Sequence, residues 1–168
     1  IEIEESANPF HDWNERITFE CYRPNAFSRI VDEKGKILEI TNNYSSISFN
    51  FGPTLLSWIE KEKPPLYQKI LEADRENLTR FGHGNAMAQV YDHIIMPLAS
   101  ERDKETEILW GIADFERHFH RKPEAIWLPE TAVNYPTLRV LVKYGIQYLI
   151  MSPFQAVRIR PLGSKKWT

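Results

Sequence analysis

The second half of the chain alternates helical and strand patterns, and this order limits the fold more than any other feature of the sequence. Apolar residues recur at helical spacing over 104–119, and a short apolar run follows at 125–128. A second helix is expected from Pro136 to just before Gly145, with Leu138, Leu141 and Val142 on its buried side. The apolar run 146–151 predicts the next, buried strand. Helices joined to strands by short loops are typical of a parallel sheet with helical crossovers, so we expect an α/β fold.

The first half predicts smaller elements. Asp12, with Glu15 three residues later, resembles a capping box that opens a helix, and Pro24 is expected to stop that helix. The other expected elements are a hairpin (27–31 and 36–41), a strand (47–51), two helices (54–61 and 66–80, with Leu78 facing inward) and a strand that becomes a loop (88–97).

Composition narrows the class of protein. The 168 residues suffice for one domain, which we place at 1–168, and 42% hydrophobic with 26% charged residues is typical of a globular chain. A net charge of -2 argues against a nucleic-acid partner, and no apolar run reaches the roughly 20 residues that span a bilayer. A single cysteine, Cys21, excludes an internal disulfide. We expect a cytoplasmic protein, although the chain begins at Ile1 and its true N-terminus is expected to lie upstream.

Glu130 is the main candidate for chemistry. In parallel α/β folds the active site gathers where strands end at their carboxyl side, and Glu130 comes directly after the strand expected at 125–128. Trp127 lies three residues earlier, and an indole beside a carboxylate suits a sugar substrate. Glu130 could equally cap the next helix, since acidic side chains favour helix N-termini. The pattern alone weighs the two roles evenly.

Further polar candidates lie between 83 and 93. His83, Asn85 and His93 offer the neutral donors and acceptors that a sugar site needs, and the glycines beside His83 indicate a close backbone approach. A loop with one surface histidine and one buried histidine is the plainer interpretation. His11 and Asp12 together with these histidines also raise a metal site, but their spacing is not compact, and we expect neither a metal nor a cofactor.

Several segments together resemble glycoside hydrolase family 57, in a poorly characterised bacterial and archaeal branch. The resemblance covers nearly the whole chain. The nucleophile region of the family is similar to 121–131, with Ala125 where the pattern has glycine. The other matching segments read HDWNERI at 11–17, HIIMPL at 93–98 and KYGIQY at 143–148.

The resemblance implies an internal fragment of a catalytic domain, namely a partial distorted (β/α)7 barrel with parallel strands and helical crossovers. It implies action on α-glucans with retention of configuration, with Glu130 as nucleophile. The acid/base of the family is an aspartate on a later strand, and 152–168 holds no acidic residue. We therefore expect the fragment to be inactive alone.

The expected partner is an oligosaccharide or polysaccharide. The residues expected to bind it are His11, Trp13, His83, Asn85, His93 and Trp127. An incomplete barrel exposes strand edges, so self-association is also expected. Two alternatives stay open: a metal-dependent carbohydrate deacetylase-like hydrolase, and a non-catalytic carbohydrate-binding or structural domain.

Overall fold

Three short parallel strands form the sheet on which the second half of the molecule is built. In this computed structural model, which describes residues 4–160 and 163–166, they are β3 (Ala88–Gln89), β4 (Ala125–Trp127) and β5 (Tyr148–Leu149). β4 is central and pairs in parallel with both neighbours. The parallel sheet expected from the sequence is therefore confirmed, although its strands are shorter than predicted.

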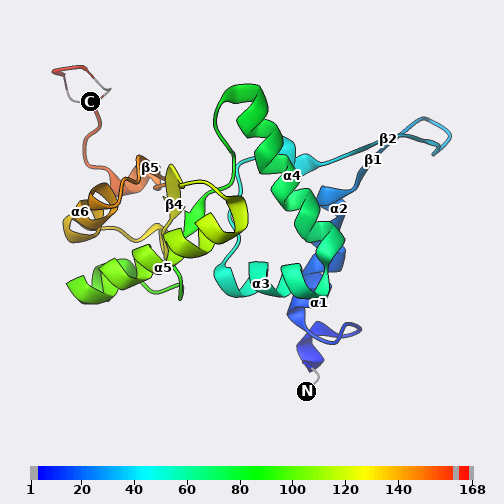
Figure 1. Ribbon diagram of the computed structural model, residues 1–168, viewed down its shortest axis with the longest axis horizontal. Helices are drawn as coiled ribbons and strands as arrows, with labels where there is room; N and C mark the ends of the chain where they lie inside the picture. The colour runs from blue at the N-terminus through cyan, green and yellow to red at the C-terminus, as the bar shows by residue number, and fades with distance from the viewer. Residues whose placement is uncertain (1–3, 161–162, 167–168) are drawn as a thin grey trace.

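Four main helices accompany the sheet. They are α3 (Pro53–Glu62), α4 (Pro64–Phe81), α5 (Glu101–Phe119) and α6 (Tyr135–Lys143). α5 connects β3 to β4, and α6 connects β4 to β5, as the helical crossovers predicted. In Figure 1, α5 and α6 lie together on the left of the view, beside β4 and β5.

Local sequence signals set where these helices begin and end. The side chain of Ser100 accepts a hydrogen bond from the Asp103 amide and opens α5 earlier than the apolar pattern indicated. Asn134 caps α6 in the same way through the Thr137 amide. Gly82 ends α4 in the left-handed conformation, with φ of 78°, which glycine adopts without steric cost.

The strand predicted at 47–51 is reduced to one bridge. Phe49 pairs in parallel with Ala86, and the Phe49 amide donates to the Asn85 carbonyl while the Met87 amide donates to the Phe49 carbonyl. The chain order along the sheet is thus Phe49, β3, β4 and β5, a sequential parallel order. Such an order is compatible with part of a barrel, but the described residues form an open sheet and no closed barrel, so this part of the prediction is not shown.

The N-terminal helix passes through Pro24 instead of stopping there. α1 (Trp13–Ile17) opens at Asp12, whose side chain accepts from the Glu15 amide as the capping pattern predicted. A π-helical segment, η2 (Thr18–Tyr22), then leads directly into α2 (Arg23–Ala26). Pro24 therefore lies inside a continuous helical stretch, directly after its π-helical segment, so the prediction of a stop was wrong.

The predicted hairpin is present as β1 (Ser28–Val31) and β2 (Ile37–Thr41), which pair antiparallel. The Asp32 carboxylate accepts from the Lys34 and Lys36 amides across the turn. Figure 1 shows the hairpin projecting away from the rest of the molecule. Short 3-10 turns complete the chain: η1 (Glu5–Ala7), η3 (Asn43–Ser46), η4 (Met96–Leu98), η5 (Pro129–Thr131) and η6 (Pro153–Gln155).

Three burial predictions were wrong. Leu78 and Val142 are exposed, because they lie beside the apolar faces of α4 and α6 rather than on them. The run 146–151 contributes only a two-residue strand, and Tyr148 on it is half exposed. In the described sheet β5 pairs with β4 alone and is therefore an edge strand.

A glycine lets α5 rest directly on the sheet. Gly111 is buried in the middle of α5, and a Cβ atom at this position would collide with the carbonyl oxygen of Gln89 in β3. Ile108 and Phe115, one turn to either side, are buried in the core. The backbone of helix and strand therefore approach each other at Gly111, while the larger neighbours fill the space around it.

The amino ends of the strands are tied together by a buried ion pair. Asp74 of α4 accepts two hydrogen bonds of 2.8 Å from Arg121, which precedes β4. The same carboxylate accepts from the amides of Asn85 and Ala86, just before β3. Burial by itself would lower the pKa of Arg121, but its hydrogen bonds and the charges of Asp74 and Glu124 outweigh burial and raise that pKa.

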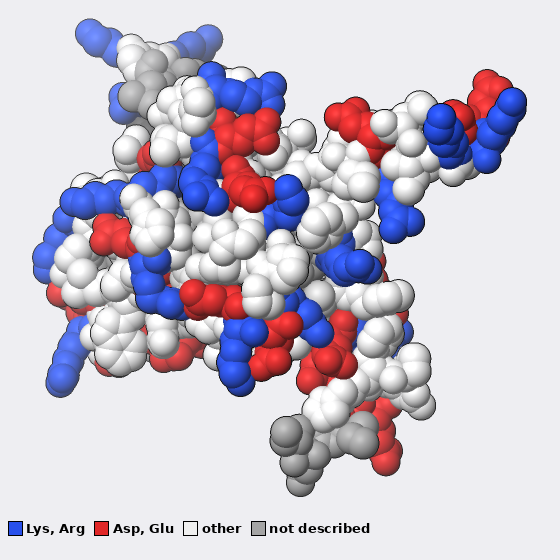
Figure 2. Space-filling view, turned by 45° about the vertical axis from the view of Figure 1, so that its right-hand side comes forward, with Lys and Arg blue, Asp and Glu red and all other residues white. Residues whose placement is uncertain are grey.

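Charges on the surface are mixed. In the view of Figure 2, acidic and basic side chains are interspersed over the visible face and along the hairpin. Among the described residues, none of the helices combines the length and the apolar character needed to cross a bilayer.

We predict that Gly111→Ala destabilises the fold by about 1–3 kcal/mol, because the added methyl group meets the backbone of β3, which cannot move aside cheaply. Helix propensity alone predicts the opposite, a gain of about 1 kcal/mol. Ala113→Gly, at an exposed position of the same helix, is the control and should cost about 1 kcal/mol. Denaturant unfolding measures both, and a stabilised Gly111→Ala variant would contradict the packing at this point.

We predict that Asp74→Asn lowers the free energy of unfolding by about 3–5 kcal/mol, because it leaves Arg121 buried without a counter-charge. The matched control is Glu76→Gln on the same helix, which weakens exposed contacts with Arg80 and Ser45 and should cost about 0–1 kcal/mol. If urea unfolding gave equal losses of unfolding free energy in the two variants, the buried pair would contribute no more to stability than the exposed one.

Candidate active site at the carboxyl edge of the sheet

Glu130 stands just beyond the carboxyl end of the central strand. β4 ends at Trp127, and Glu130 follows within the short turn η5, with its side chain exposed. The sequence placed Glu130 at a strand end, and the structure places it there. Glu130 does not line either of the two cavities described below.

The backbone at Glu130 is strained. Glu130 has φ of 54° and Thr131 has φ of 53°, two successive residues other than glycine in the left-handed region. Threonine is β-branched and is a true outlier there. Each such residue costs about 1–3 kcal/mol and persists only where surrounding contacts hold it.

A second loop at the same edge holds this turn. The Gln155 side chain, in the turn η6 beyond β5, donates to the Thr131 carbonyl at 2.8 Å and accepts from the Thr131 hydroxyl at 3.0 Å. Gln155 is held in turn by the Ser152 amide, which donates to its Oε1 atom at 2.8 Å. The loops after β4 and β5 are therefore joined beside Glu130.

His93 belongs to the same edge through the loop after β3. Gln89, the last residue of β3, lies opposite Trp127 in the register of the sheet. Its side-chain nitrogen is 2.9 Å from His93 Nδ1, and its oxygen accepts from Asn50 at 2.7 Å. Gln89, His93, Trp127 and Glu130 thus all stand at or beyond the carboxyl ends of two adjacent strands.

A cavity of about 750 Å³ opens beside His93, between the loop after β3 and the first half of α5. Trp110 lines it and stands edge-on to Tyr91, with ring centroids 5.5 Å apart. Glu107 also lines it and is almost fully buried. Burial raises the pKa of the Glu107 carboxyl, although the Asp92 amide, which donates to it, acts in the opposite direction.

His83 and Asn85 lie at the opposite edge of the sheet, because both precede β3. The side-chain amide of Asn85 donates to the backbone carbonyls of Tyr44 and Ile47 and so holds the turn η3 in place. Gly84, next to them, is close to the Asp74–Arg121 pair, and a side chain at Gly84 would collide with it. The close backbone approach expected from these glycines is therefore explained by a contact within the protein.

His11 and Trp13 lie apart from this edge, in the N-terminal segment. His11 Nδ1 is 2.9 Å from the Asp12 carboxylate, and the pKa of Asp12 is lowered by this hydrogen bond and by that from the Glu15 amide. The Trp13 indole donates to Ser6. Figure 1 shows this segment well separated from β5 and α6, so the structure does not bring these two residues to Glu130.

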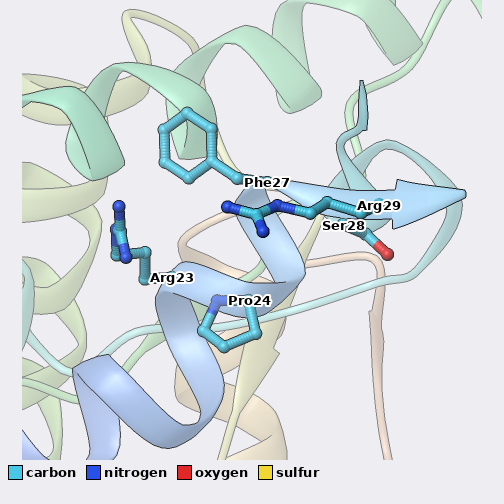
Figure 3. A pocket seen from close by; sticks show the side chains of 5 residues that line it. All are labelled: Arg23, Pro24, Phe27, Ser28 and Arg29. Carbon is cyan, nitrogen blue, oxygen red and sulfur yellow. The ribbon is translucent and has the colours of Figure 1, made fainter. Parts of the chain in front are cut away.

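A further cavity of about 340 Å³ lies between α2 and β1. Figure 3 shows Arg23, Phe27 and Arg29 around it, and none of the residues predicted for the site lines it. No group of three histidine, cysteine, aspartate or glutamate side chains within 4–160 and 163–166 is placed to hold a metal ion.

Three polar residues of the candidate site were not among the residues predicted from the sequence: Asn50, Gln89 and Gln155. Asn50 alternates with Phe49 and Phe51, a pattern that predicts a strand and does not by itself mark a site residue. Gln89 is a lone polar residue in an apolar run, which is a weak signal of a strand end. Gln155 lies in a segment without periodicity, and only the structure brings it to Thr131.

We predict that neutral His93 carries its proton on Nε2. The Gln89 oxygen accepts from Asn50, so its nitrogen faces His93 and must donate to Nδ1. Gln89→Glu removes that donor and should move the proton to Nδ1. Nitrogen-15 NMR of labelled histidines distinguishes the tautomers. His83, whose Nδ1 faces the Gly84 carbonyl, is an internal reference for the opposite tautomer. The same tautomer before and after the substitution would contradict the network.

Comparison with known proteins agrees with this architecture. Solved structures with a similar fold include an exo-type maltose-forming amylase from Pyrococcus sp. ST04, with 20% identity over 83% of this chain and 21% of that chain, and a TM-score of 0.58. An α-amylase from Thermotoga maritima is 14% identical over 88% of this chain and 37% of that one, with a TM-score of 0.50. This chain thus spans about one fifth to two fifths of their length. None of the curated proteins matches it.

The sequence pattern of one family covers most of the chain. Glycosyl hydrolase family 57 matches residues 6–157, which include β3, β4, β5 and the turn that carries Glu130. The resemblance inferred from the short motifs is confirmed at this level. The chain belongs to glycosyl hydrolase family 57.

Proposed function

We propose that this chain is the part of a retaining α-glucan hydrolase or transglycosidase that supplies the nucleophile, Glu130. The observation that carries this proposal is the position of Glu130: an exposed carboxylate in a strained turn, directly beyond the central strand of a parallel sheet. Active sites of parallel α/β folds lie at this edge, and strained backbone gathers at functional sites.

The chemistry requires two carboxyl groups. In a retaining glycosidase an ionised carboxylate attacks the anomeric carbon, the bond to the leaving oxygen breaks, and a second group protonates that oxygen. Water or another sugar hydroxyl then displaces the enzyme, which gives hydrolysis or transfer. Glu130 fits the first role, because no described hydrogen bond or ion pair engages its carboxylate. We assign this chain the nucleophile but not the acid/base, for which the family resemblance implies an aspartate on a later strand.

Neighbouring groups at this edge supply substrate contacts. Trp127 is partly buried at the end of β4 and offers an indole face to a sugar ring. His93, held by Gln89, offers an N–H donor at Nε2 to a sugar oxygen. The names of the similar amylases support an α-glucan as the substrate class of the whole protein. Within the described residues, no observation favours the metal-dependent alternative or the non-catalytic carbohydrate-binding or structural one.

We predict that Glu130→Gln in the whole protein that contains this chain lowers kcat on α-glucan oligosaccharides by about 10⁴-fold or more, because the amide keeps the shape but cannot attack. The matched control is Glu124→Gln on the same segment, a residue paired with Arg121, which should change kcat only a few-fold. Circular dichroism and thermal unfolding of both variants check that the fold survives.

A chemical rescue sharpens this test. In Glu130→Ala, azide can enter the vacated space and attack the anomeric carbon as the leaving oxygen departs, which gives a glycosyl azide of inverted configuration. Formation of that product identifies Glu130 as the nucleophile. Full activity of Glu130→Gln would show that another carboxylate has this role and would overturn the proposal.

A further inference from the structure

The turn that carries Glu130 cannot hold its shape through local preference alone. Glu130 and Thr131 are both in the left-handed region, which side chains with a Cβ atom rarely adopt and β-branched ones disfavour most. The local hydrogen bonds run from the Thr131 amide to the Leu128 carbonyl and from the Ala132 amide to the Pro129 carbonyl. These close the turn, but they leave the Thr131 carbonyl and hydroxyl to be held by something else.

Gln155 is the group that holds both. Its Nε2 atom donates to the Thr131 carbonyl at 2.8 Å, and its Oε1 atom accepts from the Thr131 hydroxyl at 3.0 Å. Gln155 is not free to move, because the Ser152 amide donates to the same Oε1 atom and the Gln155 amide donates to the Ser152 carbonyl. A prearranged side chain from the loop after β5 therefore clamps the residue next to Glu130.

The topology explains how a side chain 24 residues away reaches this turn. β4 and β5 are parallel neighbours, so their carboxyl ends lie at the same edge and the loops that follow them leave side by side. Ala125 pairs with Tyr148 and Ile126 with Leu149 in this register. The clamp thus joins two successive loops of the sheet at the point where the candidate nucleophile stands.

We infer that Gln155 is a positioning residue for Glu130: by clamping Thr131 in the left-handed conformation, it fixes the direction in which the Glu130 carboxylate points. This role rests on the proposed function of Glu130 as nucleophile. Gln155 itself touches Thr131 and Ser152 and acts on the reaction only through Thr131. Nucleophilic attack depends steeply on alignment, and a displacement of about 1 Å can reduce the rate about 10²-fold.

The first test measures the backbone without any reaction. In the isotope-labelled 168-residue chain, NMR couplings that report the sign of φ should show positive values for Glu130 and Thr131, and Gln155→Ala should shift Thr131 toward negative φ. Gln147→Ala is the matched control: it removes the same amide from an exposed glutamine at the other end of β5 and should leave both residues unchanged. Unchanged couplings in Gln155→Ala would overturn the clamp, whatever Glu130 does in catalysis.

The second test measures turnover in the whole protein. Gln155→Ala should lower kcat about 10- to 100-fold while KM stays within about threefold, and Gln147→Ala should change neither. Gln155→Glu should not rescue, because its carboxylate would face the Thr131 carbonyl without a donor. A loss of thermal stability with unchanged kcat would show that Gln155 only fastens the loop, and would overturn the inference.

A double-mutant cycle with Thr131→Gly tests whether Gln155 acts through the backbone conformation of residue 131. Glycine adopts positive φ without strain, so in that background Gln155→Ala should cost clearly less in kcat than it does beside Thr131. Equal losses in the two backgrounds would show that Gln155 does not act through the conformation of residue 131. Full activity of Glu130→Gln would refute the proposed function separately, and the NMR result would still decide whether the clamp exists.

Discussion

The buried pair of Asp74 and Arg121 is the interaction on which the rest of the structure depends. The Asp74 carboxylate accepts four hydrogen bonds, two from Arg121 and two from the backbone that leads into β3. Arg121 in turn donates to the Ala86 carbonyl and to Glu124, just before β4. One helix and the starts of two adjacent strands are thereby held at a fixed spacing. A buried ion pair of this kind is strong only when its hydrogen bonds are satisfied, as they are here.

The structural contacts and the candidate catalytic residues lie at opposite edges of the sheet. The amino edge of the sheet holds the ion pair, the tight approach at Gly84 and the Asn85 amide that fastens η3. The carboxyl edge holds Glu130 in its strained turn and the network of Gln89 with His93. Because the strands are parallel, each edge gathers the same end of every strand. The strain at Glu130 can persist because the Gln155 side chain, from the loop after β5, holds the adjacent Thr131.

The sequence predicted the helices and strands better than it predicted the contacts between them. Helices α3, α4, α5 and α6, the hairpin and the central strand were all expected close to their observed positions. Local rules failed where tertiary packing decides, as at Pro24, which a π-helical segment accommodates, and at Val142, which faces outward. For the site, the pattern singled out Glu130, Trp127 and His93 at strand ends. It also grouped His83 and Asn85 with them, because nearness in sequence does not show whether a residue lies at the amino end or the carboxyl end of a strand.

The sequence by itself determined the parallel α/β character, the family and the position of Glu130 after a strand. These follow from periodicity and short motifs, which act over a few residues. The tertiary structure decided which side chains meet: Asp74 with Arg121, Gln89 with His93 and Gln155 with Thr131. These partners are 47, 4 and 24 residues apart. The physical reason is that strand pairing and helix packing fix such distances, so a pattern read along the chain carries no record of the groups that packing brings together.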